Sequence, residues 1–286
     1  MEIPRSAKPK IQLRMTDGYK KVSKIVRTNR LNTVCEEARC PNIYDCWGRE
    51  TATIMILGDV CTRSCGFCSV KTGKPSSVDL KEPIRIGKAV KDMGLKHVVL
   101  TSVDRDDLKN DFGATIWANT ITEIRKTSPD CTIEVLTPDF QGYKPALQIV
   151  FDAKPDIFSH NVECVERISK KVRVQAIWVR SLTVLQNSVD IGLLTKSGMM
   201  VGLGETNEEV LETMQVVADL GVKVFTVGQY LQPTNKHLSV KRYVEKHEFD
   251  MFKVEGLKLG FEIVESGPLV RSSYHADEQA LSALKS

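Results

Sequence analysis

Short apolar runs alternate with longer amphipathic stretches from about residue 50 to residue 265. The apolar runs are rich in valine, isoleucine and leucine, which is typical of strands buried on both faces of a sheet. We predict strands over 53–57, 97–101, 132–136, 157–159, 175–179, 199–203 and 222–227. The amphipathic stretches carry apolar residues at helical spacing and predict helices over 84–93, 114–126, 181–189, 208–220 and 248–259.

Strands that alternate with helices indicate an α/β fold with a parallel sheet and right-handed crossovers. About six βα units follow one another without a change in composition, which favours a partial (β/α)6 barrel over two separate domains. We expect the barrel over 51–265, an N-terminal extension over 1–50 and a C-terminal tail over 266–286.

Polar segments follow directly after several predicted strands. Parallel strands end at the same edge of a barrel, so these segments should converge at one mouth, where ligands bind. One of them follows residue 57 and holds three cysteines, and the others are 101–102, 159–163, 202–206 and 229–233. The sequence therefore predicts a single shared site at the mouth.

Composition excludes some classes of protein. Of the 286 residues, 42% are hydrophobic and 27% are charged, which is ordinary for a globular protein that dissolves in water. No apolar run approaches the roughly 20 residues that span a bilayer, so we expect no membrane association. A net charge of +4 is too small to indicate nucleic-acid binding.

The positive charge is concentrated at the N-terminus. Residues 1–30 hold nine lysines and arginines against Glu2 and Asp17, so this arm carries +7 and the remainder of the chain −3. The arm could dock an acidic partner, or it could be a solvated extension. An organellar transit peptide is a further reading, although Pro4 and Pro9 would interrupt its amphipathic helix.

Six of the eight cysteines lie between Cys35 and Cys68 in two triplets. A chain of this length needs no disulfides to fold, and no secretory signal precedes the cysteines, so thiolate ligation of metal is the better interpretation. We expect a reducing, cytoplasmic location. The first triplet is Cys35, Cys40 and Cys46, and the second is Cys61, Cys65 and Cys68.

The second triplet has the spacing Cys-x3-Cys-x2-Cys. Three thiolates on a [4Fe-4S] cluster leave one of the four irons without a protein ligand, and an open iron can bind a substrate. Structural zinc prefers four closed ligands, often as Cys-x2-Cys pairs, and fits this spacing poorly. We therefore predict an iron–sulfur cluster on Cys61, Cys65 and Cys68.

This motif, placed after a predicted strand, resembles that of the radical S-adenosylmethionine (SAM) enzymes. The resemblance implies that the methionine part of SAM chelates the open iron and that its reductive cleavage yields a 5′-deoxyadenosyl radical. It also implies a radical SAM barrel in which the backbone at Phe67 contacts the adenine.

The first triplet, Cys-x4-Cys-x5-Cys, resembles the second-cluster motif of the lipoyl synthase family. The resemblance extends from about residue 30 to residue 280. It is carried further by VVLTSVDRDD at 98–107, IEVLTPDF at 133–140, TKSGMMVGLGET at 195–206, GQYLQP at 228–233 and SGPLVRSSYHAD at 266–277.

Membership of that family would imply two [4Fe-4S] clusters and the insertion of two sulfur atoms, at C6 and C8, into a protein-bound octanoyl-lysine. The auxiliary cluster, held by the two extensions, would supply the sulfur and be consumed. In the family a serine of the Arg-Ser-Ser-Tyr motif ligates that cluster. We assign Ser273 by position and keep Ser272 as the alternative. An alkoxide is a hard ligand for a soft cluster and should leave readily.

The resemblance also implies the residues that contact SAM. Asn161 and Glu163 would hold the ribose and methionine parts, although a loop that caps the next helix is the alternative. Arg180 would end a strand and pair with the methionine carboxylate, or form a surface ion pair. Thr101 and Ser102 could donate hydrogen bonds to the methionine end, or simply end a strand.

The implied partners are octanoylated carrier domains of dehydrogenase E2 subunits and of the glycine cleavage H protein. A ferredoxin or flavodoxin would supply electrons, and an iron–sulfur assembly carrier would restore the cluster. Three parts of the sequence depart from the family pattern, namely Cys164, 111–113 and 172–178. None of them includes a predicted cluster ligand. Two alternatives stay open, namely another radical SAM sulfur-inserting enzyme and a non-catalytic iron–sulfur carrier.

Overall fold

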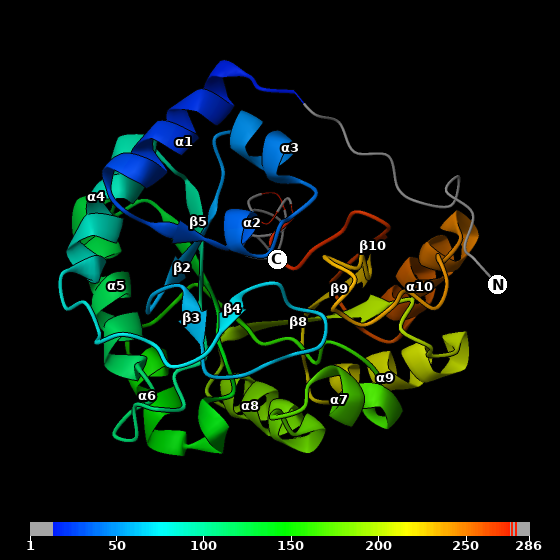
Figure 1. Ribbon diagram of the computed structural model, residues 1–286. Coiled ribbons are helices and arrows are strands. Elements are labelled where there is room, and N and C mark those ends of the chain that lie inside the picture. Colours follow the sequence, from blue (N-terminus) through cyan, green and yellow to red (C-terminus); the bar gives the residue numbers. More distant parts are fainter. Residues whose placement is uncertain (1–13, 275, 277, 279–286) are drawn as a thin grey trace.

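The chain folds around one large, mostly parallel sheet (Figure 1). The computed structural model describes residues 14–274, 276 and 278. The sheet contains β1 (Asn32–Thr33), β2 (Thr53–Ile56), β5 (His97–Ser102), β6 (Thr132–Leu136), β7 (Ile157–Ser159), β8 (Leu194–Val201), β9 (Val224–Gln229) and β10 (Ile263–Gly267), in that order. All neighbours pair in parallel except β1, which is antiparallel to β2. No described residue of β1 pairs with β10, so the barrel stays open, as predicted.

Helices cover the outside of the strands (Figure 1). They are α4 (Glu82–Met93), α5 (Ala114–Thr127), α6 (Lys144–Asp152), α7 (Glu166–Val172), α8 (Trp178–Asp190), α9 (Asn207–Asp219) and α10 (Lys246–Lys258). Their apolar faces pack on the sheet through side chains such as Ile86, Ile121 and Val210, all completely buried. The predicted alternation of strands and helices is thus confirmed, and it produces the predicted α/β partial barrel.

One strand prediction is wrong and another is correct only in part, for physical reasons. The run 175–179 is a loop and the start of α8, because Ile177 and Val179 are surface residues whose apolar character mimics a buried strand. The run 199–203 contains only the end of β8, which begins at Leu194 and includes a buried lysine. β10 is a seventh parallel strand that we did not predict, because Glu265 and Ser266 interrupt its apolar pattern.

Part of the N-terminal arm is a packed helix. α1 (Asp17–Thr28) begins at the N-cap Thr16 and buries Val22 and Val26 against the barrel. The α2 (Val34–Glu37) and α3 (Ile43–Gly48) helices follow, and the Tyr19 ring stacks on that of Tyr44 with 5.3 Å between centroids. The reading of the arm as a solvated extension is therefore wrong for 17–28, and residues 1–13 lie outside the described part of the chain.

The N-terminal and C-terminal segments meet at the open side of the barrel (Figure 1). The side-chain amide of Asn42 donates to the Leu269 carbonyl oxygen at 2.7 Å, and Arg49 pairs with Glu278 at 2.6 Å. A short ribbon of β3 (Val60–Cys61) and β4 (Lys71–Thr72) lies beside the sheet. No helix in the described part of the chain has the length and apolar character to cross a bilayer.

A buried ion pair links two strands inside the barrel. Lys196 on β8 lies 3.0 Å from the carboxylate of Glu134 on β6, and both side chains are at most 1% exposed. The His97 ring lies 3.7 Å from the same carboxylate. Burial alone would raise the pKa of Glu134, but Lys196 and His97 outweigh it and lower that pKa.

We expect Lys196→Met to destabilise the protein by about 3–5 kcal/mol, because it leaves a buried carboxylate without its cation. Lys196→Met combined with Glu134→Leu should recover most of that loss, since no charge is then left unpaired. Chemical denaturation of the three proteins at neutral pH measures both effects. A double variant no more stable than Lys196→Met would contradict this explanation.

Candidate functional site

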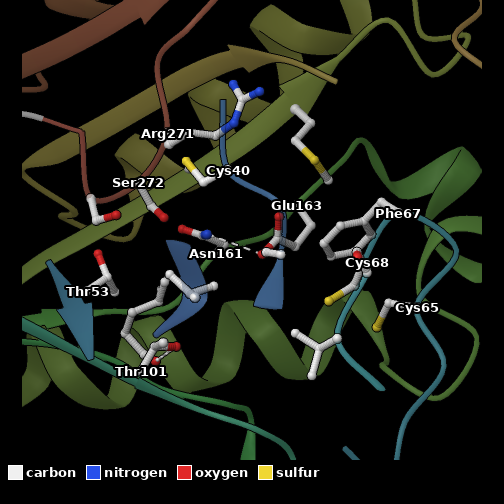
Figure 2. Close-up of a pocket in the computed structure, with 18 of the residues that line it drawn as sticks. Cys40, Thr53, Cys65, Phe67, Cys68, Thr101, Asn161, Glu163, Arg271 and Ser272 are labelled. Atoms are coloured by element: carbon white, nitrogen blue, oxygen red, sulfur yellow. Dashed lines mark hydrogen bonds between the residues drawn. The ribbon is translucent and has the colours of Figure 1, made fainter. Parts of the chain in front are cut away.

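A cavity of about 550 Å³ opens at the carboxyl ends of the strands and extends into the barrel. Figure 2 shows Cys65, Phe67 and Cys68 at one side of it and Cys40, Arg271 and Ser272 at the other, with Asn161 and Glu163 between them. The predicted convergence therefore occurs for the cysteine segment and for members of 101–102, 159–163 and 229–233, and it brings members of both cysteine triplets to one cavity. It is wrong for 202–206, because no residue of that turn is among those that line the cavity.

The second triplet begins at Cys61, the last residue of β3, and continues on the loop that leaves this strand. The backbone N–H groups of Arg63 and Asp104 point at the Cys61 sulfur, at 3.4 and 3.3 Å. Two further backbone contacts hold the loop, from Gly66 to the Val172 carbonyl and from Thr62 to the Asp104 carbonyl. Such N–H groups stabilise a thiolate, so the loop is built to hold ionised sulfur.

Arg63 anchors this loop from within. Its side chain is only 4% exposed and reaches three carboxylates on two neighbouring loops. The guanidinium binds Asp106 through two nitrogens at 2.7 and 2.9 Å, Asp139 at 2.6 Å and Asp104 at 3.2 Å. Burial alone would raise the pKa of Asp139, but Arg63 outweighs it and holds that pKa at about 2. A forked, charge-assisted contact of this kind fixes both position and orientation.

A second contact holds the other end of the loop. The His237 Nε2–H donates to the Cys68 carbonyl oxygen at 2.9 Å, while Thr234 binds the other ring nitrogen at 2.8 Å. The Leu238 N–H donates to the Gly66 carbonyl, and a Cβ at Gly66 would lie 2.9 Å from the Leu238 side chain. A larger residue at position 66 would therefore have to displace the Leu238 side chain where the two segments touch.

The thiols of the second triplet suit a cationic cluster. Burial, together with the charges of Asp104 and Cys68, raises the pKa of Cys61 to about 11 and that of Cys65 to about 12. Three half-buried thiols that resist ionisation together need a strong cation to become thiolates. An iron–sulfur cluster supplies that positive charge, and the backbone N–H groups at Cys61 fit its sulfur ligands.

The first triplet lines a second, smaller cavity beside the first. Cys35, Cys40 and Cys46 all contribute to it, together with Arg271 and Ser273 from the C-terminal segment. Burial raises the pKa of Cys35 to about 12 and also raises that of Cys46, and the neighbouring cysteine charges add to both shifts. This donor set therefore also fits a cationic cluster. Ser272 lines only the larger cavity.

Arg271 is a cation that neither sequence pattern nor spacing led us to consider. It lines both cavities, and its guanidinium donates a hydrogen bond to the Val270 carbonyl oxygen at 2.6 Å. Burial lowers its pKa, while the charge of Cys40 acts in the opposite direction. The guanidinium lies over the bare α-carbon of Gly228, where a Cβ would approach it to 3.3 Å. It is placed to compensate negative charge on the first triplet.

Most of the residues predicted to contact SAM line the larger cavity. They are Phe67, Thr101, Ser102, Asn161 and Glu163. Asn161 donates to the Glu163 carboxylate at 3.1 Å, and Glu163 has a positive φ of 67°. Burial raises the pKa of Glu163, which Arg173 and Asn161 partly offset. The two side chains therefore form one polar unit facing the cavity.

Arg180 lies elsewhere. It belongs to α8 rather than to a strand, is not among the residues that line the cavity, and pairs with Asp139 at 3.2 Å. Arg173 lines the cavity instead and donates to the Val162 carbonyl oxygen at 3.0 Å. We identified neither Arg63 nor Arg173 as a site residue from the sequence. Arg63 could have been noticed, because it is a charged residue between the predicted ligands Cys61 and Cys65.

Comparison with known sequences identifies close relatives. The profile of the Radical SAM superfamily matches residues 55–217. A protein named lipoyl synthase from Rubrobacter xylanophilus is 56% identical over 264 residues, which cover 92% of this chain and 82% of that protein. One of the same name from Flavobacterium psychrophilum is 49% identical over 273 residues, or 95% and 94% of the two chains.

Solved structures share the fold at low sequence identity. Streptococcus suis SuiB bound to S-adenosylmethionine superposes with a TM-score of 0.60 at 13% identity, over 80% of this chain and 55% of that one. Methylornithine synthase (PylB) gives a TM-score of 0.51 at 14% identity, over 92% and 82% of the chains. These similarities support the open barrel and nothing finer.

Proposed function

The chain belongs to the lipoyl synthase family of the Radical SAM superfamily, and we propose that it inserts sulfur at C6 and C8 of an octanoyl group on a lysine of a carrier domain. The observation that carries this proposal is the meeting of both cysteine triplets at one barrel cavity. A non-catalytic cluster carrier would have no use for a cavity of about 550 Å³ between its two cysteine sites.

The two triplets have separate roles in this proposal. Cys61, Cys65 and Cys68 hold the [4Fe-4S] cluster that binds SAM, and Cys35, Cys40 and Cys46 hold the auxiliary one. When bound, the clusters and SAM supply the electron, the hydrogen abstraction and the sulfur that functionalising a saturated carbon requires. The barrel supplies placement, since one cavity wall carries cysteines of both triplets and can hold the reacting groups in a fixed arrangement.

Residues of the cavity orient SAM and the acyl chain. Asn161 and Glu163 present a paired amide and carboxylate to a cofactor with hydroxyl and amino groups. The Thr101 hydroxyl donates to the Leu136 carbonyl oxygen at 3.0 Å, so it offers the cavity a lone pair rather than the predicted donor, beside Ser102. Phe67 and the apolar wall around Met199 suit the adenine ring and the octanoyl chain.

Several partners follow from this activity. The carriers are the octanoylated domains of dehydrogenase E2 subunits and of the glycine cleavage H protein. A ferredoxin or flavodoxin delivers the electron, and an iron–sulfur assembly carrier rebuilds the consumed cluster. These assignments rest on the family alone.

The direct test is mass spectrometry of an octanoyl-lysine peptide after anaerobic incubation with cluster-reconstituted protein, SAM and a strong reductant. We expect a gain of two sulfur atoms together with release of 5′-deoxyadenosine. Deoxyadenosine without sulfur insertion would indicate another substrate, and the absence of both products would overturn the enzymatic assignment.

Ser273 provides a sharper prediction. Ser273 lines the small cavity with all three cysteines of the first triplet, so we propose its hydroxyl oxygen as the fourth ligand there. A thiolate is a softer and stronger ligand for iron than an alkoxide, so Ser273→Cys should keep the auxiliary cluster while reducing lipoyl formation by about 100-fold or more. Ser272→Cys is the matched control and should stay near wild type, because Ser272 lines only the larger cavity.

Iron and sulfide analysis after turnover measures the first effect, and product mass spectrometry measures the second. Full activity of Ser273→Cys would contradict the assignment. The opposite ranking of the two variants would transfer the role to Ser272.

A further inference from the structure

Exposed aliphatic side chains gather in the connection that follows β7. Val174, Ile177 and Val179 are 62%, 52% and 58% exposed, and they lie within six consecutive residues. Exposing such side chains singly is normal, but a contiguous group at the edge of a cavity indicates an interaction surface. Tyr143 in the preceding strand–helix connection is also exposed.

This surface belongs to the rim of the cavity. Arg173 and Ala176, from the same connection, line the cavity itself. The side chain of Gln175 accepts from the Ser64 N–H at 3.2 Å and lies 3.3 Å from its hydroxyl, which ties the rim to the loop of the second triplet. Helices of a βα barrel run antiparallel to its strands, so the start of α8 lies at the mouth.

The loop that carries Tyr143 adjoins the same rim. A Cβ added to Gly142 would lie 3.4 Å from Cγ of Arg180, in the first turn of α8. Tyr143 therefore lies close to the start of α8, where Val179 is exposed. We call Tyr143, Val174, Ile177 and Val179 the rim patch.

Lysines flank the rim patch. Lys144 adjoins Tyr143, and Lys170 and Lys171 end α7, just before Val174. All three are exposed, and within the part of the chain that the structure describes none of them forms an ion pair. Glu166, at the start of α7, is the exposed carboxylate on that helix. By contrast, Lys20 and Lys21 on α1 are paired with Asp17 and Glu50.

We infer that the rim patch and its lysines dock the body of the carrier domain whose acylated lysine enters the cavity. The inference rests on the proposed function. A lysine side chain with an eight-carbon acyl group is a short tether, so the carrier must sit on the rim of the cavity that receives it. Unpaired lysines around an apolar centre fit a partner that presents carboxylates beside its acylated lysine.

The test compares two substrates of the same enzyme, an octanoyl-lysine peptide and an octanoylated carrier domain. Ile177→Asp should raise KM and the dissociation constant for the domain about 10- to 100-fold. Lys170→Glu with Lys171→Glu should raise both about tenfold and remove much of their salt dependence. Sulfur insertion into the short peptide should stay within about twofold of wild type, since the peptide does not cover the rim.

Matched controls come from two other helices of the barrel, α4 and α10. Val254→Asp places the same charge at an exposed aliphatic residue of α10, and Lys88→Glu with Lys91→Glu reverses two exposed charges of α4. Both should leave the domain and the peptide equally good substrates.

Equal losses on domain and peptide, or no loss on either, would overturn the docking surface. A rim variant that changed the oligomeric state but not domain binding would assign the patch to a second copy of the chain. Binding of the domain is measured without turnover, so a protein that binds it through the rim but inserts no sulfur would refute the proposed function and not the docking surface.

Discussion

Replacing Cys61, Cys65 and Cys68 together by alanine is expected to abolish SAM cleavage and to lower bound iron from about eight to about four atoms per chain. The three thiols share one segment, and the charge of Arg173 only partly offsets the raised pKa of Cys65, so a bound cluster is needed to ionise them. Lipoyl formation should fall by at least about 1,000-fold, equivalent to more than about 4 kcal/mol of barrier. Iron analysis and 5′-deoxyadenosine assays measure the two effects.

The same substitutions in the first triplet should separate the two sites. Without Cys35, Cys40 and Cys46, iron should again fall by half, but SAM cleavage should persist while no sulfur is inserted. Cys131→Ala is the matched control. Its thiol is buried outside both cavities, so we expect full iron content and a loss of only about 1 kcal/mol in stability. Loss of SAM cleavage in both triple variants would show that the sites do not act separately.

Arg63→Met is expected to cost about 3–5 kcal/mol of unfolding free energy and to prevent assembly of the second-triplet cluster. The substitution leaves Asp104, Asp106 and Asp139 close together without the cation that they share. Their repulsion should separate the loops that position Cys61. Chemical denaturation and iron analysis at neutral pH measure the two losses.

Two variants distinguish position from charge. Arg63→Lys keeps the charge but loses the forked contact with Asp106, so we expect an intermediate loss of both stability and iron. Arg180 is the second, partly exposed partner of the buried Asp139. Arg180→Met should therefore cost about 1 kcal/mol in stability and leave the iron content normal. If Arg63→Met retained four irons on this triplet, Arg63 would not be the anchor of the loop.

The sequence predicted those features that depend on residues close together in the chain. Cysteine spacing is local, so the sequence alone grouped Cys61, Cys65 and Cys68, and apolar runs such as 97–101 marked buried strands. The same signal was misleading at 175–179, because the apolar side chains of Ile177 and Val179 are exposed on the surface rather than buried in a strand. A single sequence cannot separate these two causes.

The sequence by itself determined the alternating α/β architecture and the two cysteine groups, because both depend on the spacing of residue types over short stretches of the chain. The tertiary structure decided which distant residues meet. It joined Ser273 and Arg271 to the first triplet across more than 200 residues and paired Arg63 with Asp139. It also moved Arg180 away from the cavity and brought Arg173 to it. Such meetings depend on the register of strands and the packing of loops, which local patterns do not specify.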